Sequence, residues 1–562
     1  MSKNPRVAIA TMPTGVPGLD AVLGGGLPEY SFNLIAGTPG TGKTTLAHQI
    51  MFELASPERP ALFFTVLGEP PLKMLRYQQQ MEFFDATKIG ESVHFIDLGD
   101  VVIDQGLSQV LETIVSHVEE RNPGIVIVDS FQTIVRAATA VTDYPMSLQR
   151  FVQSLAVHLT SWQATTFLIG EQMDIEMRGN PVFTVADGII WLSQSTDRNS
   201  SVRKLQVVKS RGQAPMPGLH TFRISQQGIQ VFPRMSMAER GAEPPEARGR
   251  ITTGVEGLDA LIGGGIPAGD ALLVSGPSGT GKSVLARQFI TAGARSGEPG
   301  VIAVFEEHPR EYLRRANDLG MELEELERQG TVKVIYLRPL DLSPDEALSA
   351  IRESVAQLGA RRVVIDSLSG FELALAPTFR QDFRESLYRL VGALTETGIT
   401  VLLTMEIVQR SEDLRFSPYV ISFLADNIIL LRYVEIAGQL RKNLSVIKMR
   451  NSDHSKDFWL YEITTQGLIV RGPMRDYRGI GTGAAELRDG QRPVVYSGLT
   501  DQETGVLRAL IELGAASPAA LGQRTGLTTL NLSAALERLI SLEYAIRRGG
   551  ESEAVYLPVA HS

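Results

Sequence analysis

The chain of 562 residues contains no cysteine. Disulfide bonds, metal sites built on thiolates and cysteine nucleophiles are therefore all excluded. The eight histidines show none of the spacings that are typical of metal ligands. Any metal that the protein binds is expected to take oxygen ligands, as Mg²⁺ does.

Long hydrophobic segments are missing as well. No apolar run approaches the ~20 residues that a membrane-spanning helix needs, and the run at residues 7–10 is too short for the core of a signal peptide. We therefore expect a cytoplasmic protein without a membrane partner. An excess of positive charge is also missing. The net charge of −9 gives no general attraction to nucleic acid, although it does not exclude a local basic patch.

A phosphate-binding loop is present twice, as Gly37-Thr-Pro-Gly-Thr-Gly-Lys43-Thr44 and Gly276-Pro-Ser-Gly-Thr-Gly-Lys282-Ser283. In the pattern G-x-x-x-x-G-K-[ST], backbone N–H groups surround the phosphates, the lysine reaches the β- and γ-phosphates, and the hydroxyl binds Mg²⁺. ATP and Mg²⁺ are the expected cofactors. The residues expected at the nucleotide are Gly40, Thr41, Gly42, Lys43, Thr44 and Thr45, and Gly279, Thr280, Gly281, Lys282, Ser283 and Val284.

The two loops belong to a longer internal duplication, because the second copy lies 239 residues after the first at many other positions. The matching positions are Thr14-Gly15 and Thr253-Gly254, Gly18-Leu19-Asp20 and Gly257-Leu258-Asp259, Gly24-Gly25-Gly26 and Gly263-Gly264-Gly265, Asp187 and Asp426, and Lys209 with Arg211 and Lys448 with Arg450.

Each copy is predicted to be an α/β domain. Continuous apolar runs such as Ile125–Asp129 and Arg362–Asp366 are typical of strands that are buried on both faces of a mainly parallel, twisted sheet. The segments between the runs are long enough for crossover helices, for example Gln149–Ser161. We expect domains at 1–234 and 251–475, separated by a charged, Pro- and Gly-rich linker at 235–250.

The end of the chain has a different pattern. After a weakly patterned linker at 476–496, Thr500 and Glu503 match a capping box, and Gly549-Gly550 predicts a turn between two strands. Further helices are expected from Ser517 and from Thr528. Residues 497–562 are therefore predicted to form a small winged-helix-like domain.

Both copies supply a second carboxylate for the metal. Asp129 and Asp366 each end an apolar strand and precede a serine, where an Asp is often only a helix cap. Because each follows a phosphate-binding loop, we favour a role in binding Mg²⁺. The expected metal ligands are Thr44 and Asp129 in the first copy, and Ser283, Glu306 and Asp366 in the second.

The two copies differ where a catalytic base is needed. In the second, Glu306 and Glu307 follow the strand Val301–Phe305, and two adjacent acids repel each other in a way that suits water activation. These are the predicted catalytic residues. The equivalent positions of the first copy are Leu67 and Gly68, and Glu69 is displaced. The first domain is therefore expected to bind nucleotide and to hydrolyse it poorly unless Glu69 moves in.

These motifs resemble the KaiC family of double-domain ATPases, which belongs to the RecA-like P-loop superfamily. The resemblance covers roughly residues 6–475. It rests on Thr-Gly-Val-x-Gly-Leu-Asp with a glycine triplet, both phosphate-binding loops, Phe305-Glu306-Glu307, Val434-Glu435-Ile436-x-Gly438 and Lys448-Met449-Arg450. It implies two tandem RecA-like domains and a homohexameric ring with ATP between neighbouring subunits.

The resemblance also implies that cations reach across to the γ-phosphate of the adjacent subunit, which would make hydrolysis depend on assembly. The alternative is that they are solvated cations at strand ends. Lys442 replaces an arginine of the KaiC nucleotide shell and loses its bidentate geometry. The residues concerned are Lys209, Ser210, Arg211, Lys442, Lys448, Met449 and Arg450.

KaiC phosphorylates an adjacent Ser-Thr pair, and the corresponding residues here are Ser422 and Phe423. A two-site phosphorylation cycle is thereby excluded in that form. Autophosphorylation at Ser422 alone is one interpretation, and a buried serine without such a role is the other.

Three classes of function stay open: an ATP-hydrolysing signalling switch with a regulatory protein partner, a DNA-handling or transcription-regulating ATPase that uses the C-terminal domain, and a nucleotide-binding scaffold without turnover. From Ser497 onward, five Arg and no Lys stand against seven Asp and Glu. This balance favours a protein-binding or regulatory role for that domain over DNA binding. The Glu306-Glu307 pair argues against the scaffold.

Overall fold

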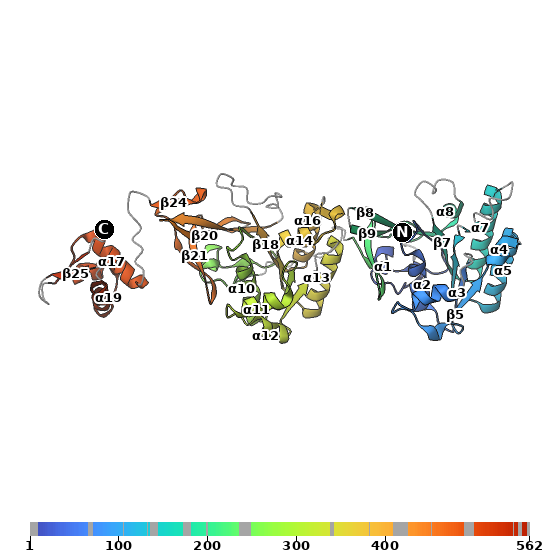
Figure 1. Ribbon diagram of the computed structural model, residues 1–562, viewed down its shortest axis with the longest axis horizontal. Helices are drawn as coiled ribbons and strands as arrows, with labels where there is room; N and C mark the ends of the chain where they lie inside the picture. Colours follow the sequence, from blue (N-terminus) through green and yellow to red (C-terminus); the bar gives the residue numbers. More distant parts are fainter. Residues whose placement is uncertain are drawn as a thin grey trace, which may run out of the picture. The chain divides into compact units, whose positions relative to one another are not determined.

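The computed structural model divides the chain into two compact units, Met1–Glu435 with Leu440–Arg475 and Ile480–Ala484, and a second that consists mainly of Ala485–Ser562. Figure 1 shows the elements of both units along the chain. The structure describes residues 9–65, 71–104, 106–131, 133–134, 144–171, 181–197, 200–234, 249–337, 342–380, 383–407, 425–450, 452–487, 499–542, 545–548 and 554–558.

The first repeat is built on a sheet with the strand order β11-β10-β9-β8-β3-β7-β6-β4-β5. The strands from β8 to β5 run parallel, and β9 and β10 are each antiparallel to their neighbours. The strands are β3 (Phe32–Gly37), β4 (Ala61–Thr65), β5 (Val93–Asp97), β6 (Ile125–Asp129), β7 (Thr165–Glu171), β8 (Gly188–Asp197), β9 (Ser200–Ser210), β10 (His220–Ser225) and β11 (Gly228–Phe232).

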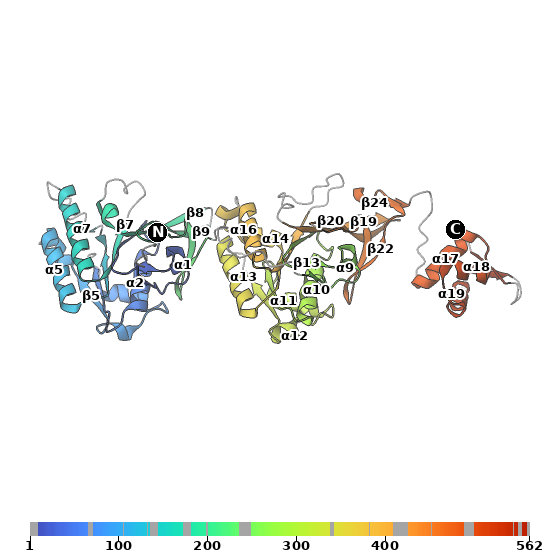
Figure 2. The same cartoon turned by 180° about the vertical axis from the view of Figure 1, so that it is seen from behind.

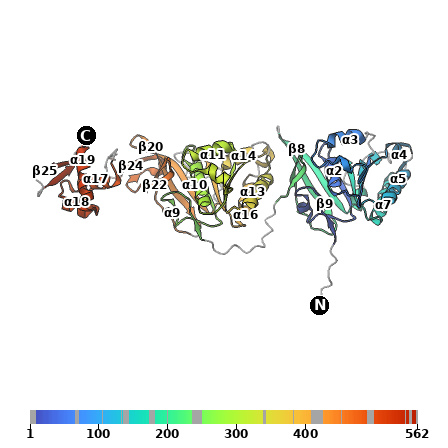
Figure 3. The ribbon, with the colours of Figure 1, turned by 90° about the horizontal axis from the view of Figure 1, so that it is seen from below.

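Helices cover both faces of this sheet. One hydrophobic cluster joins the sheet to α1 and α2, and a second joins the other face to α5 and α7; Figure 3 shows α2 and α7 on different sides of the strands. The helices are α1 (Leu19–Leu23), α2 (Lys43–Leu54), α3 (Pro71–Gln78), η1 (Ala86–Lys88), α4 (Gly99–Asp104), α5 (Gly106–Arg121), α7 (Tyr144–Ser161) and α8 (Pro181–Val185). β1 (Thr11–Met12) and β2 (Leu27–Pro28) form a separate pair.

The second repeat has the same plan, with the strand order β16-β15-β17-β18-β14-β19-β20-β21-β22. The strands from β16 to β19 run parallel. The strands are β14 (Ala271–Gly276), β15 (Gly300–Val304), β16 (Val332–Tyr336), β17 (Arg362–Asp366), β18 (Thr400–Glu406), β19 (Asn427–Ile436), β20 (Gln439–Met449), β21 (Trp459–Thr464) and β22 (Gly467–Pro473).

In this repeat α10 and α12 pack on one face of the sheet, and α13 and α16 pack on the other, as Figure 2 shows. The helices are α9 (Leu258–Leu261), α10 (Lys282–Arg295), α11 (Pro309–Asn317), α12 (Leu323–Arg328), α13 (Pro344–Leu358), α14 (Leu368–Ala374), α15 (Pro377–Arg380) and α16 (Phe383–Thr395). The remaining elements are β12 (Arg250–Ile251), β13 (Ile266–Pro267), β23 (Tyr477–Arg478), η4 (Ile480–Thr482) and β24 (Ala484–Leu487). Two tandem, mainly parallel α/β domains are thus confirmed.

The duplication extends to individual hydrogen bonds. The amide of Gln49 on α2 exchanges two hydrogen bonds with the backbone of Ile229, and Gln288 on α10 does the same with Leu468. Each pair ties the helix that follows the phosphate-binding loop to the last strand of its sheet. Because both partners are buried, these bonds also satisfy backbone groups that water cannot reach.

The antiparallel strands at the edges were not predicted. Strand β9 alternates buried residues such as Val202 and Leu205 with partly exposed ones, because one face of an antiparallel sheet can meet water. Such a pattern is weaker in the sequence than a continuous apolar run. Helix α7 begins at Tyr144, before the expected start at Gln149.

The second unit contains α17 (Asp501–Leu513), α18 (Pro518–Thr525), α19 (Thr529–Ser541), β25 (Ala545–Arg548) and β26 (Val555–Pro558). The predicted capping box is present, since Thr500 and Glu503 bond each other's backbone N–H. Buried leucines of the three helices form its core, and β25 and β26 form an antiparallel pair. Its classification as a winged helix and the predicted domain boundaries stay predictions. In the described residues no helix is long and apolar enough to cross a membrane.

A histidine is buried in the core of the first repeat. His48 on α2 is fully buried among Phe52, Phe63 and Phe95, with its ring centroid 4.6 Å from that of Phe63. Neither ring nitrogen makes a hydrogen bond of good geometry, and Gln78 is the polar side chain that interacts with the ring. Burial lowers the pKa of His48 to about 4, so the ring is neutral in the folded domain at neutral pH.

We expect this histidine to make the first domain sensitive to acid. Between pH 6.5 and 4 the unfolded chain takes up a proton that the folded domain excludes, so the free energy of unfolding falls as the pH is lowered, by about 3 kcal/mol in total. Urea unfolding followed by tryptophan fluorescence in a Trp459→Phe background reports on the first domain. His48→Leu should flatten the pH dependence, and exposed His158→Gln should not. The same slope in His48→Leu and the parent would contradict the prediction.

Candidate functional site

Each phosphate-binding loop connects a central strand to a helix: β3 to α2 and β14 to α10. The residues before the helices, Gly42 and Gly281, have φ angles of 98° and 97°, which only glycine adopts without strain. A Cβ atom at either position would also lie 2.6 Å from the Cδ1 atom of Ile224 or Ile463. Gly42 and Gly281 are therefore required by their backbone conformation.

The lysine of each loop lies against the loop itself. Lys43 Nζ donates to the carbonyl of Thr38 at 2.9 Å, and Lys282 Nζ donates to the carbonyls of Gly276 and Pro277, both at 2.9 Å. Burial lowers the pKa of both lysines, and nearby carboxylates oppose the shift. These carboxylates are Glu171 and Asp129 around Lys43, and Glu406, Asp366 and Glu306 around Lys282.

The predicted metal ligands fit Mg²⁺. Thr44 Oγ1 donates to Asp129 Oδ2 at 2.8 Å, so the two expected ligands of the first domain are adjacent. Burial raises the pKa of Asp129 to about 6, against the hydrogen bond from Thr44 and the charge of Lys43. In the second domain Ser283 and Asp366 line one pocket. Among the described residues there is no group of three or more His, Asp or Glu that could hold a metal ion.

The second domain has a pocket of ≈ 580 Å³ at the carboxyl ends of its central strands. Its wall combines the phosphate-binding loop with residues from β17, β18 and the segment after β15. The residues that line it include Lys282, Ser283, Glu306, Glu307, Tyr312, Arg315, Asp366, Ser367 and Glu406. Lys282 therefore lies among several acids, in a cavity that is large enough to hold a nucleotide.

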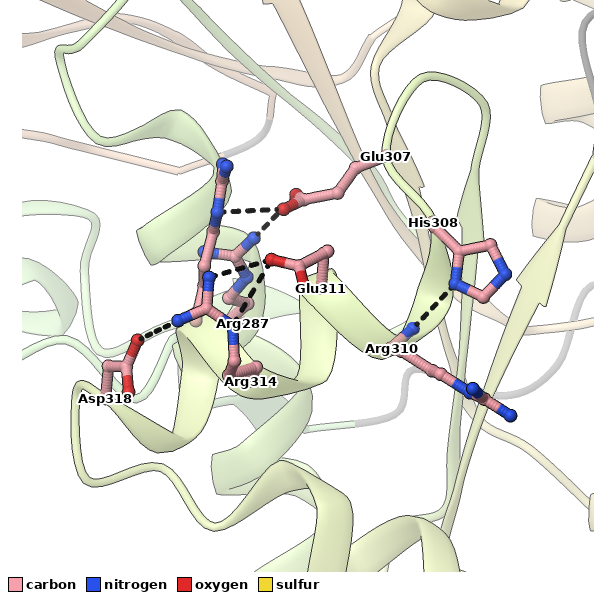
Figure 4. A network of polar contacts seen from close by, with 8 residues as sticks. Arg287, Glu307, His308, Arg310, Glu311, Arg314 and Asp318 are labelled. Atoms are coloured by element: carbon pink, nitrogen blue, oxygen red, sulfur yellow. Dashed lines mark hydrogen bonds and ion pairs between the residues drawn. The ribbon is translucent and has the colours of Figure 1, made fainter.

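The two glutamates of the pair have different partners. Glu306 Oε1 accepts a hydrogen bond from Ser367 Oγ at 3.1 Å. Glu307 instead forms ion pairs with Arg287 at 3.2 Å and with Arg315 at 3.0 Å. Figure 4 shows Glu307 directed toward Arg287. Glu306 is therefore the acid without an arginine partner among the described contacts. Leu67, Gly68 and Glu69 lie outside the described residues.

Helix α11 follows this pair. His308 caps its first turn, with Nδ1 accepting from the backbone N–H of Arg310 at 3.3 Å. On its exposed side Arg314 pairs with Glu311 at 2.8 Å and with Asp318 at 3.4 Å. This cap fixes the start of helix α11 directly after Glu307.

The cations that were expected to act between subunits lie away from the phosphate-binding loop of their own domain. Arg211 pairs with Asp187 at 3.1 Å and Arg450 with Asp426 at 2.8 Å. Both aspartates precede strands that run parallel to the loop-bearing strand, so these pairs lie at the amino ends of the strands. The loop lies at the carboxyl ends. The side chains of Arg211 and Arg450 are 61% and 64% exposed.

The neighbouring predicted residues share this position. Lys209 Nζ donates to the carbonyls of Phe183 and Thr184, and Lys448 Nζ donates to that of Ala425. Burial lowers the pKa of Lys209, and Arg211 adds to the shift. Ser210 bonds Gln213, Met449 is buried and Lys442 is half-buried on β20. None of these described residues lines the pocket around Lys282. Ser422 lies outside the described residues.

Sequence reasoning missed one acid in each repeat. Glu171 ends β7 beside Gly37, and Glu406 ends β18 beside Gly276, so each flanks the first glycine of a phosphate-binding loop. The available clue was that both repeats have a seven-residue strand that begins with threonine and ends with glutamate. Their spacing of 235 residues, not 239, hides them from an alignment at fixed offset.

Two tyrosines of the second repeat were also missed. Tyr433 and Tyr461 donate to the loop carbonyls of Ser278 and Thr280 at 3.1 and 2.5 Å. Their equivalents in the first repeat, at a spacing of 239, are Gln194 and Phe222. The second loop is thereby held by hydroxyl groups that the first repeat lacks.

These features define a protein with two P-loop nucleotide-binding domains, each on a mainly parallel sheet with an acid beside the loop lysine. The chain belongs to the KaiC family: residues 12–236 and 251–474 each match the family described as ATPase: KaiC. The resemblance predicted from the motifs and the two tandem RecA-like domains are thus confirmed.

Curated relatives support the assignment to the KaiC family. The circadian clock oscillator protein KaiC of Picosynechococcus sp. is 29% identical over 481 residues, which cover 84% of this chain and 91% of the relative. KaiC of Thermostichus vulcanus is 29% identical over 489 residues, covering 84% and 92%. KaiC of Parathermosynechococcus lividus is 30% identical over 494 residues, covering 84% and 87%. The similarity therefore extends across both repeats.

Tyr461→Phe should weaken nucleotide binding at the second loop by up to about tenfold, because the buried carbonyl of Thr280 loses its hydrogen bond, which is worth roughly 1 kcal/mol. The first repeat shows that a phenylalanine, Phe222, fits this position, so the fold should persist. Titration of a fluorescent ADP analogue in a Lys43→Ala background measures the effect, with circular dichroism as the check on folding. Binding equal to that of the parent would contradict the role of the hydroxyl.

Proposed function

We propose that the protein binds Mg²⁺–ATP at both phosphate-binding loops and hydrolyses it mainly in the second domain, as an ATP-dependent signalling switch. The observation that carries this proposal is the convergence of Lys282, Asp366 and Glu306 in one pocket. A scaffold without turnover would not need Glu306 in addition to the metal ligand Asp366.

In the proposed mechanism Lys282 contacts the β- and γ-phosphates, and the backbone N–H groups of the loop surround them. Ser283 and Asp366 would hold Mg²⁺, which would neutralise charge on the phosphoryl group. Glu306 orients the attacking water and accepts its proton, and Ser367 holds the Glu306 carboxylate through its hydroxyl.

Glu306→Gln should lower kcat by about 10²-fold or more, because the amide cannot accept a proton, while ADP affinity stays near that of the parent. Steady-state phosphate release and nucleotide titration measure the two effects separately. Unchanged turnover in Glu306→Gln would remove the proposed mechanism.

In the first domain we propose binding with slow turnover. Lys43, Thr44 and Asp129 form the metal and phosphate site, but the two residues equivalent to the glutamate pair are Leu67 and Gly68. Nucleotide bound there would mainly stabilise assembly.

Lys282→Ala should therefore abolish most ATP hydrolysis, whereas Lys43→Ala should mainly weaken nucleotide-dependent assembly. Light scattering after size exclusion, with and without ATP, gives the particle mass, and the same samples give the rate of hydrolysis. Equal loss of turnover in both variants with assembly intact would contradict this division.

We further propose that the sites are completed between subunits of a homohexameric ring. Two observations support this proposal. Lys448 and Arg450 lie at the end of the sheet opposite to their own loop, and Arg450 is largely exposed. A cation in that position can reach a γ-phosphate only on another subunit, and Lys209 with Arg211 repeats the arrangement.

Mixing two inactive variants tests this arrangement. Lys282→Ala lacks the loop lysine, and Arg450→Ala lacks the cation proposed to act on the neighbour. Because a mixed ring contains interfaces with both groups intact, the mixture should regain hydrolysis that neither variant shows alone. Arg475→Ala, which changes an exposed arginine paired with Asp457, is the control and should keep its activity. A mixture as inactive as its components would contradict completion in trans.

For the C-terminal unit we propose a winged helix-turn-helix that contacts a regulatory protein. On α19, the exposed Leu530 (81%) and the single Arg538, already paired with Glu503, offer little to DNA phosphates. For a DNA-binding role, the alternative residues are Arg547 and Arg548 on β25. Autophosphorylation at Ser422 stays a proposal from the KaiC resemblance.

A further inference from the structure

A buried arginine holds the second glutamate of the pair. The Arg287 side chain on α10 is 5% exposed, and its Nη2 lies 3.2 Å from Glu307 Oε2. Its guanidinium carbon lies 4.0 Å from the centroid of the Tyr312 ring. Arg315, which is 60% exposed, approaches Glu307 Oε1 from the pocket side at 3.0 Å. Figure 4 shows Arg287 and Glu307 facing each other.

Burial makes the two charges of this pair depend on each other. A desolvated guanidinium is unfavourable unless an acid neutralises it, and removing one member leaves the other charge uncompensated. The Tyr312 ring adds a cation–π contact on the face of Arg287. Breaking the ion pair between Glu307 and Arg287 is therefore unfavourable, although Glu307 is next to Glu306 and lines the same pocket.

The first repeat offers an internal comparison. At a spacing of 239, Arg287 corresponds to His48 and Glu307 to Gly68. His48 lies among phenylalanine rings, and its lowered pKa of about 4 keeps it neutral at pH 7. The repeat that lacks the second acid therefore also lacks the buried charge. This paired difference indicates that Arg287 serves Glu307 and is not a general need of the fold.

We propose that Arg287 is a positioning residue that keeps the Glu307 carboxylate out of the catalytic position, so that Glu306 alone activates water. The proposal rests on ATP hydrolysis in the second domain. If Arg287 is removed, Glu307 keeps only the exposed Arg315, on the pocket side, as its partner. Its carboxylate then turns toward the pocket and competes with Glu306 and with the phosphates. If both charges are removed, the competition ends.

The test measures kcat and KM for ATP in the full chain, after subtraction of the turnover that remains in Lys282→Ala. We expect Glu306→Gln to lose about 10²-fold and Glu307→Gln far less. Arg287→Met should lose at least about tenfold in kcat with little change in KM. The double variant Arg287→Met/Glu307→Gln should recover to the level of Glu307→Gln, and Arg287→Lys, which keeps the charge, should retain most activity.

Arg314→Met is the matched control, because this arginine pairs on the exposed side of α11 with Glu311 and Asp318. It should behave as the parent. ADP affinity shows that each variant is folded at the second loop. A double variant as slow as Arg287→Met, or Glu307→Gln as slow as Glu306→Gln, would overturn the inference. An unaffected Glu306→Gln would instead overturn the proposed hydrolysis itself.

Discussion

The parallel pairing of the central strands determines which residues of the second domain meet in the pocket. Strands β14, β15, β17 and β18 are hydrogen-bonded in register and point the same way, so whatever follows their carboxyl ends meets at one edge. The sequence places the phosphate-binding loop, the glutamate pair, Asp366 and Glu406 at these ends. The pocket therefore follows from strand order, and each polar side chain enters it from a different connection.

This arrangement concentrates negative charge around the phosphate-binding loop. Lys282 stands among the carboxylates of Glu306, Asp366 and Glu406, and a triphosphate would bring further negative charge. Such a site favours a nucleotide only with additional cations, because like charges in a partly desolvated pocket repel strongly. Mg²⁺ would supply one such positive charge. The exposed Arg450 on another subunit would supply a second, which links the acid-rich pocket to the proposed dependence on assembly.

Much of the fold could be predicted from the sequence, since buried parallel strands appear as continuous apolar runs and the loops match a specific pattern. The antiparallel edge strands were missed because their alternation is weak. The partners of Glu307 could not be predicted, because Arg287 and Arg315 come from two helices and their direction depends on packing. Adjacent acids were expected to repel each other. In the folded chain, Arg287 and Arg315 pair with Glu307, and only Glu306 remains beside Ser367.

The duplication allows each repeat to be judged against the other. Around the second loop, hydroxyls and charges occupy positions that are apolar or neutral in the first: Tyr461 against Phe222, and Arg287 against His48. Polar groups at buried positions cost stability unless they are paired, so each of these groups needs a partner in the fold. In the second repeat both groups have partners, the loop carbonyl of Thr280 and the acid Glu307. Their presence on one side of the duplication alone favours a catalytic second domain beside a first domain that binds nucleotide.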